Sequence, residues 1–163
     1  MSGRVTIVGE LNPYGADPAY ALYPLPEGAS GARLRDVLGL TTLGYLGTYA
    51  RANLCVGRWS IVAAREAAVA ILRERRGVIL LGRRVAAAFG LARHPPFSLV
   101  SIPVAGSGSM RIVTLALLPH PSGRCREWDA PRAVEKARSC VRMLHAAHNN
   151  EGSSIGGPGE RQG

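Results

Sequence analysis

Lysine is almost absent from this sequence of 163 residues, in which Lys136 is the only example. Arginine therefore carries nearly all of the positive charge, and the chain has a net charge of +9 at pH 7 and a sequence pI of about 10.5. A balance this basic indicates a polyanionic partner, either nucleic acid or a membrane surface. Because a guanidinium group binds phosphate through two hydrogen bonds, the preference for arginine favours DNA. A GC-rich genome, with its arginine and alanine codons, accounts for the same composition.

Cysteine is scarce, and long apolar runs are missing. Cys55, Cys125 and Cys140 include no CxxC pair, and three cysteines cannot pair completely, which argues against a disulfide framework and a zinc finger. We therefore expect reduced thiols, no metal cluster and a cytoplasmic location. No segment has the length and apolarity of a membrane span, and no signal peptide is recognisable, so we expect no membrane partner. Nothing indicates an oligomer, and we expect a monomer.

Apolar segments separated by turn signals predict one α/β domain over residues 1–148. Strands are predicted at 4–8, 52–56, 78–81, 98–103 and 111–118, the fourth of them at a sheet edge. Helices are predicted at 32–38, 42–49, 60–75, 83–89 and 131–145. This alternation is typical of a three-layer α/β/α domain with a mostly parallel central sheet of about four strands. The polar, glycine-rich residues 149–163 predict a disordered tail.

Sites in such sheets lie beyond the carboxyl ends of the strands, which directs attention to the loop after residues 111–118. His120 stands there between Pro119 and Pro121. Because proline fixes φ, the loop is stiff and can present an imidazole at a defined point. The following residues 122–124 suit a phosphate and a DNA groove. The same segment is also consistent with a simple chain-reversing turn that carries a solvated histidine.

Polar side chains also follow the first predicted strand. Glu10 and Asn12 lie just beyond it, and either can position a water molecule, Glu10 also as a base. Asn12 and Pro13 are equally an ordinary turn signal. Asn53 lies inside a short apolar strand, where its amide needs hydrogen-bond partners once buried. That amide can read the edge of a base or be satisfied by the backbone.

Aromatic residues gather in the long first loop, over residues 9–31. Tyr14, Tyr20 and Tyr23 can stack on an extruded base or pin the loop to the core, and for Tyr20 we favour the packing role. Gly82 and Arg83 open a helix directly after a strand, where free N–H groups favour an anion. They form neither a Walker loop nor a dinucleotide fingerprint.

Four segments, in this order, resemble motifs of the uracil-DNA glycosylase superfamily over roughly residues 4–145. Residues 9–14 (GELNPY) resemble its loop after the first strand, with one residue more between Gly and Pro, and residues 120–124 (HPSGR) resemble its loop after the last strand. Residues 53–55 (NLC) are similar to a stretch of the single-strand-selective members. Residues 77–90 resemble a strand–helix unit shared with the iron–sulfur members. The cluster cysteines are absent, so the resemblance implies no cofactor.

The resemblance implies a role for each matching position. His120 would donate to the pyrimidine carbonyl and stabilise the leaving base anion, while Asn12 or Glu10 would orient or activate the water. Asn53 would hydrogen-bond the flipped base and Tyr23 would stack on it, and in some relatives a tyrosine at the place of Tyr14 blocks bulk at C5. DNA would be held by Arg124, which would fill the gap in the duplex, and at its phosphates by Ser122, Gly123, Gly82 and Arg83.

The leading hypothesis is thus a DNA glycosylase that leaves an abasic site. Its motifs hold no lysine for a Schiff base, so we expect a monofunctional enzyme. Uracil is the default substrate, and a modified pyrimidine such as the glucosylated hydroxymethylcytosine of some phages is the alternative, in which case the enzyme would serve antiviral defence. A non-catalytic DNA-binding module and a small-nucleotide-binding protein are the hypotheses of other classes.

Overall fold

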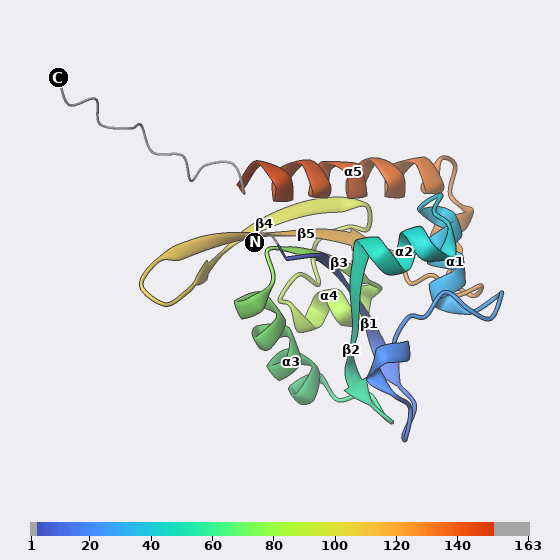
Figure 1. Cartoon of the computed structure of the whole chain (residues 1–163), viewed down its shortest axis with the longest axis horizontal. Coiled ribbons are helices and arrows are strands. Elements are labelled where there is room, and N and C mark those ends of the chain that lie inside the picture. Colours follow the sequence, from blue (N-terminus) through green and yellow to red (C-terminus); the bar gives the residue numbers. More distant parts are fainter. Residues whose placement is uncertain (1–2, 152–163) are drawn as a thin grey trace.

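The central sheet has five strands in the order β2-β1-β3-β5-β4. Four of them run parallel, and β4 pairs antiparallel with β5 at one edge. This computed structural model describes residues 3–151 of the chain (Figure 1). The strands are β1 (Val5–Asn12), β2 (Tyr49–Val56), β3 (Gly77–Leu81), β4 (Ser98–Ala105) and β5 (Met110–Leu118).

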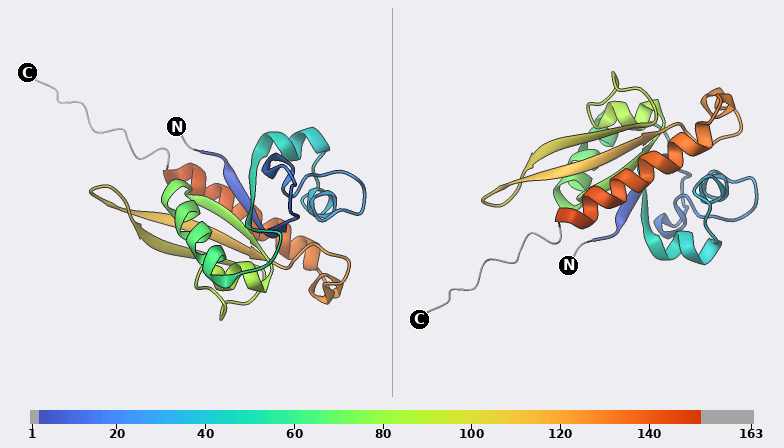
Figure 2. Two further views of the ribbon diagram at one scale, coloured as in Figure 1. Left: turned by 90° about the horizontal axis from the view of Figure 1, so that it is seen from below. Right: turned by 90° about the horizontal axis from the view of Figure 1, so that it is seen from above.

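Helices cover both faces of the sheet and make the predicted three-layer α/β/α arrangement, which the two turned views display (Figure 2). One face carries α3 (Ile61–Glu74) and α4 (Arg83–Ala88). The other carries α1 (Ser30–Val37), α2 (Thr42–Thr48) and α5 (Ala133–Glu151). Short 3-10 turns at Pro18–Tyr20 and Arg126–Asp129, labelled η1 and η2, lie in the loops after β1 and β5.

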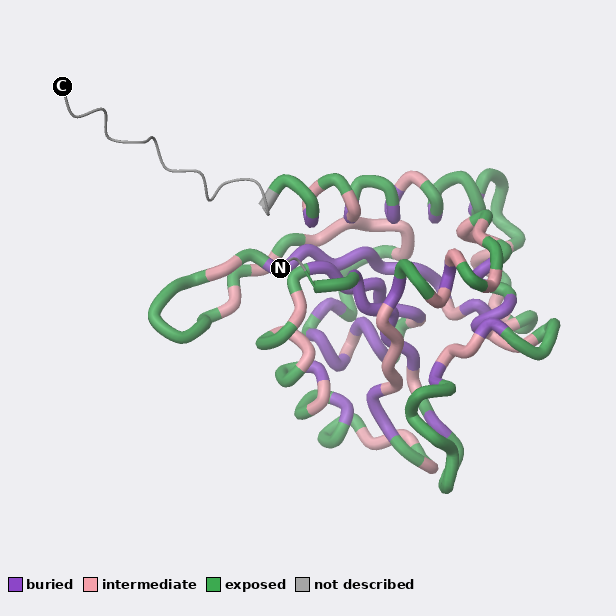
Figure 3. Tube along the Cα trace, viewed as in Figure 1, coloured by how far each residue is buried: buried purple, intermediate pink, exposed green. Residues whose placement is uncertain are grey.

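The alternation of side chains along β1 explains how one strand serves two cores. Val8 packs in the core under α3 and α4, whereas Ile7 packs in the core under α5. Successive side chains of a strand point to opposite faces, so a strand in the middle of such a sheet must be apolar on both. β3 is buried at all five of its residues, while the helices are exposed on their outer faces (Figure 3).

Three features of the elements differ from the predictions, namely the number of strands and two boundaries. The sheet has five strands rather than about four, because the edge strand β4 adds a full antiparallel ladder to β5. β1 continues to Asn12 rather than ending at residue 8, since β2 pairs with it to that point despite the polar side chains. The last helix begins at Ala133 rather than at Pro131, because Arg132 before it has a φ of 63°.

The end of α5 also departs from the expectation. The helix continues past residue 145 to Glu151, so the first residues of the expected tail are helical. Residues 152–163, for which disorder was predicted, lie outside the described part of the chain. Over residues 3–151, no helix has the length and apolarity needed to cross a membrane.

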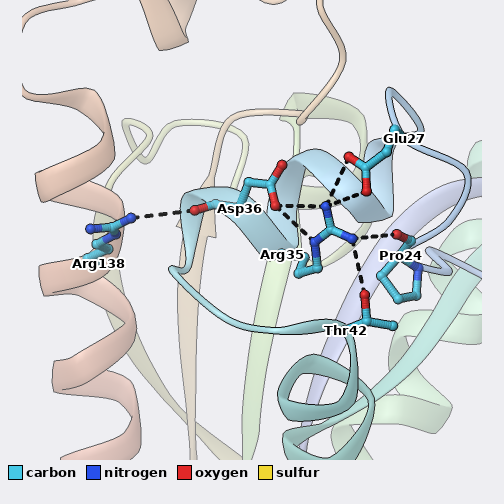
Figure 4. A network of polar contacts seen from close by, with 6 residues as sticks. All are labelled: Pro24, Glu27, Arg35, Asp36, Thr42 and Arg138. Atoms are coloured by element: carbon cyan, nitrogen blue, oxygen red, sulfur yellow. Dashed lines mark hydrogen bonds and ion pairs between the residues drawn. The ribbon is translucent and has the colours of Figure 1, made fainter.

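A buried arginine fixes the long loop onto α1 (Figure 4). Arg35 is 8% exposed, and its guanidinium group contacts both carboxylate oxygens of Glu27 at 2.8 and 3.0 Å. It also donates to Asp36, to the carbonyl oxygen of Pro24 and to the Thr42 hydroxyl. Because five N–H donors meet partners from the loop, α1 and α2, this one side chain joins three segments.

We expect Arg35→Ala to lower the midpoint of urea unfolding clearly, because it leaves the buried Pro24 carbonyl without its donor and releases Glu27. Arg65→Ala, at an exposed position of α3, is the control and should leave the midpoint unchanged. An Arg35→Ala midpoint equal to that of the control would contradict this role.

Candidate functional site

A cavity of about 500 Å³ opens at the carboxyl ends of β1 and β2, under the loop that leads to α1. Pockets for small organic ligands have roughly this size, ~300–1,000 Å³. The cavity is lined by polar groups of the strand ends and by apolar side chains of the loop: Glu10, Leu11, Asn12, Pro13, Tyr20, Leu22, Tyr23, Leu25, Ala29, Ser30, Gly31, Asn53 and His120. It thus brings together six of the residues that the sequence singled out.

His120 is held by its own loop. The backbone N–H of Ser122 donates to its Nδ1 at 3.2 Å, so in a neutral imidazole the ring proton is on Nε2. The indole N–H of Trp128 donates to the carbonyl oxygen of His120 at 2.9 Å, and Trp128 itself packs edge-on against Phe97. These contacts fix the backbone and, in the neutral ring, the tautomer, and His120 is one of the residues that line the cavity.

Gly82 places the end of β3 directly against His120. Its φ of 92° and ψ of 165° lie in a region that only glycine adopts readily. A Cβ at this position would lie 3.2 Å from Cβ of His120 and 3.8 Å from Oε1 of Glu10. The Gly82 N–H also donates to the carbonyl oxygen of Leu118 at 2.9 Å, which joins the ends of β3 and β5. Because Gly82 has no side chain, His120 and Glu10 can both lie close to its backbone.

Glu10 lies near the end of β1 and is partly buried. One of its carboxylate oxygens is 3.9 Å from the guanidinium group of Arg84, a distance typical of a loose ion pair. Arg84 also lies over the ring of Trp59, 5.9 Å from its centroid. Glu10 thus keeps carboxylate oxygens for other partners at the edge of the cavity.

Asn12 and Asn53 form a pair across β1 and β2. The Asn53 amide N–H donates to Oδ1 of Asn12 at 2.7 Å, and Asn12 is only 7% exposed. A Cβ on Gly9, the register partner of Asn53, would lie 2.3 Å from Oδ1 of Asn53, so that oxygen is seated on the bare backbone of β1. This hydrogen bond fixes the orientation of both amides and gives the Asn53 amide N–H a side-chain partner.

The loop wall of the cavity is built around Leu22, a non-glycine residue with a φ of 50°. The Tyr45 hydroxyl donates to its carbonyl oxygen at 3.0 Å, and burial raises the pKa of Tyr45, so that hydroxyl stays protonated. Arg51 donates to the carbonyl oxygens of Ala21 and Ala19 and lies over the Tyr23 ring, 5.4 Å from its centroid. The wall is therefore fixed by side chains of α2 and β2.

The three tyrosines of the loop do not all lie at the cavity. Tyr23 lines the cavity, with Tyr20 packed edge-on against it at 5.1 Å between ring centroids. Tyr14 does not line it: its ring covers Gly57, where a Cβ would clash at 2.0 Å, and the residue is 74% exposed. Tyr20, expected to pin the loop, thus lies nearer to the cavity than Tyr14 does.

The residues expected at phosphates do not share one surface. Arg83 forms an ion pair of 2.8 Å with Glu127, while its side chain is 87% exposed. Ser122 and Gly123 line a separate hollow, where the guanidinium group of Arg33 covers Gly123. Arg124, the next residue, is exposed.

The sequence reading missed three features that shape the site, namely Trp128, Arg51 and Leu22. Trp128 belongs to none of the motifs, and only its indole bond to the His120 carbonyl gives it a place in the site. Arg51 and Leu22 are far from each other in sequence, and no motif marks either one. The direct signal available for Trp128 was its place in the same short loop as His120.

No model of a known protein family matches this chain, and no curated protein matches it. Within residues 3–151, no three His, Cys, Asp or Glu side chains are grouped so that they could hold a metal ion. The three cysteines are free thiols. The interpretation of the site therefore rests on its geometry.

We expect Gly82→Ala to cost about 1–3 kcal/mol of unfolding free energy, because alanine is strained at a φ of 92°. It should also shift the ring NMR signals of His120, since the new Cβ lies 3.2 Å from Cβ of that residue. The control is Gly90→Ala, at a φ of 77° with no atom within 4 Å of the new Cβ. Equal His120 signals in the two variants would show that Gly82 does not set its position.

Proposed function

We propose that this chain is a monofunctional DNA glycosylase that hydrolyses the N-glycosidic bond of a flipped-out pyrimidine and leaves an abasic site. The observation that carries the proposal is the His120 imidazole, whose Nδ1 accepts from Ser122 and whose Nε2 is left to donate at a cavity of base-accommodating size. The basic charge of the chain, +9, fits a DNA substrate.

His120 has the chemistry that loss of a base requires. When the bond between C1′ and the base nitrogen breaks, its electron pair leaves with the base, and negative charge develops on the pyrimidine carbonyl. A fixed N–H donor at that oxygen stabilises the charge more in the transition state than in the ground state. Because the Ser122 N–H holds the tautomer in advance, no reorientation of the ring is needed.

Glu10 is the better candidate for the water that attacks the sugar cation. Oδ1 of Asn12 already accepts a hydrogen bond from Asn53, whereas within residues 3–151 the Glu10 carboxylate has only Arg84, at 3.9 Å, as an ion-pair partner. A carboxylate can take a proton from the water while the water oxygen bonds to C1′. A neutral amide can only orient the water. We therefore assign activation of the water to Glu10 and the setting of the Asn53 amide to Asn12.

The remaining cavity residues would bind the flipped base. Asn53 presents an amide whose orientation Asn12 fixes, which suits the donor and acceptor groups of a pyrimidine edge. Tyr23 supplies an aromatic face, and Arg51 on that ring limits its movement. The exposed Arg124, beside Ser122 and Gly123, would enter the space that the base leaves in the duplex.

We expect His120→Ala to lower the rate of base release by about 100- to 1,000-fold, the usual cost of removing one donor from such a site. Release is measured on oligonucleotides that carry uracil, hypoxanthine or hypermodified cytosine, with alkali cleavage at the abasic site. Arg65→Ala, at an exposed position of α3 that lines neither cavity, is the control and should retain the full rate.

Two results would contradict the proposal. No base release across the whole panel would remove the enzymatic function. DNA binding that falls with salt, survives His120→Ala and gives no abasic product would instead identify a non-catalytic DNA-binding module.

The geometry also favours a second candidate substrate, a pyrimidine with a bulky group such as glucosylated hydroxymethylcytosine. The cavity of about 500 Å³ is open, and Tyr14 lies against Gly57 instead of closing the cavity. An enzyme of this specificity would act on modified phage DNA and serve antiviral defence.

We expect Leu22→Phe to affect release of the two substrates differently, because a phenylalanine ring is larger than the leucine side chain and narrows the cavity next to Gly9. Release of a glucosylated base should fall by roughly 10-fold or more, while release of uracil changes less. Leu43→Phe, on an exposed position of α2, is the control. A variant that slows both substrates equally would argue against selection by cavity size.

A further inference from the structure

A second cavity of about 260 Å³ is lined by Gly82 and by Pro119, the residue before His120. It is smaller than the usual pocket for a drug-sized ligand, so it suits a single small ring system. The segment after α4 forms one wall, and the ends of β3 and β5 form the other. Its lining residues are Gly82, Arg83, Ala86, Ala92, His94, Pro95, Pro96, Leu117, Leu118, Pro119 and Glu127.

The wall between the two cavities is thin. Gly82 lines the second cavity, and a Cβ on it would already be 3.2 Å from Cβ of His120 and 3.8 Å from Oε1 of Glu10, both of which line the first. Pro119 lines the second cavity, and the next residue along the chain, His120, lines the first. A ligand that fills both sites therefore needs two groups joined by a short linker across this wall.

The second cavity is apolar in its depth and polar at its rim. Ala86, Leu117 and Leu118 are buried, and Pro95 and Pro96 add flat apolar surface. Polar groups come from the Arg83–Glu127 ion pair and His94. A planar heterocycle with apolar faces and a polar edge matches this distribution, and a nucleobase is such a group.

The ion pair of 2.8 Å changes what Arg83 is suited to bind. The Arg83 side chain is 87% exposed, so the ion pair leaves its other N–H donors accessible, and Glu127 places a carboxylate acceptor beside them. Side by side, the two residues offer N–H donors and a carboxylate acceptor. The edge of a base carries acceptors and donors that can pair with them.

We propose that this second cavity binds the base next to the excised nucleotide on the same strand. Adjacent bases are joined by one phosphodiester unit, as the thin wall of Gly82, Pro119 and His120 requires. This inference rests on the proposed glycosylase function, and it assigns Arg83 to a neighbouring base rather than to a phosphate.

The test removes the neighbouring base instead of changing its identity. The target nucleotide is placed in a single strand whose neighbour on the 5′ side, on the 3′ side or on neither is an abasic spacer. We expect the spacer to slow base release roughly 10-fold on one side and not on the other, because contact with one base is lost.

Variants then locate the contact. Ala92→Trp, at an exposed lining position, fills the cavity, so the variant should process normal DNA at the slow rate and ignore the spacer. Ala70→Trp, exposed on α3, is the control and should behave as the unaltered chain. Arg83→Gln distinguishes the two roles of Arg83: loss of a base contact slows only DNA that has the neighbouring base, whereas loss of a phosphate contact slows both DNAs equally.

Failure of this inference can be told from failure of the proposed function. Base release that no spacer affects overturns the second site and leaves the glycosylase intact. If no base is released at all, the glycosylase is wrong, and the same strands are compared by fluorescence anisotropy. A one-sided loss of affinity that Ala92→Trp abolishes would then support the second site as a base-binding site, and equal affinities would overturn it.

Discussion

The site depends on one backbone constraint, the conformation of Gly82 at the end of β3. Its N–H bonds to the Leu118 carbonyl and so joins the end of β3 to the end of β5, the strand that His120 follows. Its φ of 92° turns the chain into α4 at once, and the missing side chain leaves room for His120 and Glu10. A larger residue here would press on His120 and reach Glu10, which line the first cavity, from a position that lines the second.

The other site residues are also fixed by hydrogen bonds, for His120 from its own loop and for Asn53 and Leu22 from elements that are distant in sequence. Trp128 and Ser122 hold His120, Asn12 holds Asn53, and Tyr45 holds the Leu22 carbonyl. Each bond sets the direction of a polar group before any ligand arrives, which lowers the cost of reorganisation in a reaction. The strand ends therefore form a rigid wall of the cavity, and the loop that leads to α1 forms the other wall.

Much of the fold follows from the sequence, because the apolar segments that become β3 and β5 have no other stable place than the middle of a sheet. Boundaries at polar residues did not follow. Glu10 and Asn12 resemble loop residues, and only pairing with β2 keeps them in β1. Likewise the left-handed Arg132, rather than the proline before it, decides where α5 begins.

For the site, the sequence by itself determined which groups stand at strand ends: His120 after β5, Glu10 and Asn12 at the end of β1, and Gly82 after β3. The parallel sheet then had to collect them at one edge. Only the tertiary structure decided their partners, since an ion pair such as Arg83–Glu127 or an amide pair such as Asn12–Asn53 joins residues 44 and 41 positions apart. Local patterns cannot encode such contacts, because each depends on the packing of two separate elements. For that reason only the folded chain reveals the cavity, the orientation of its amides and the position of Tyr14 against Gly57 instead of at the cavity.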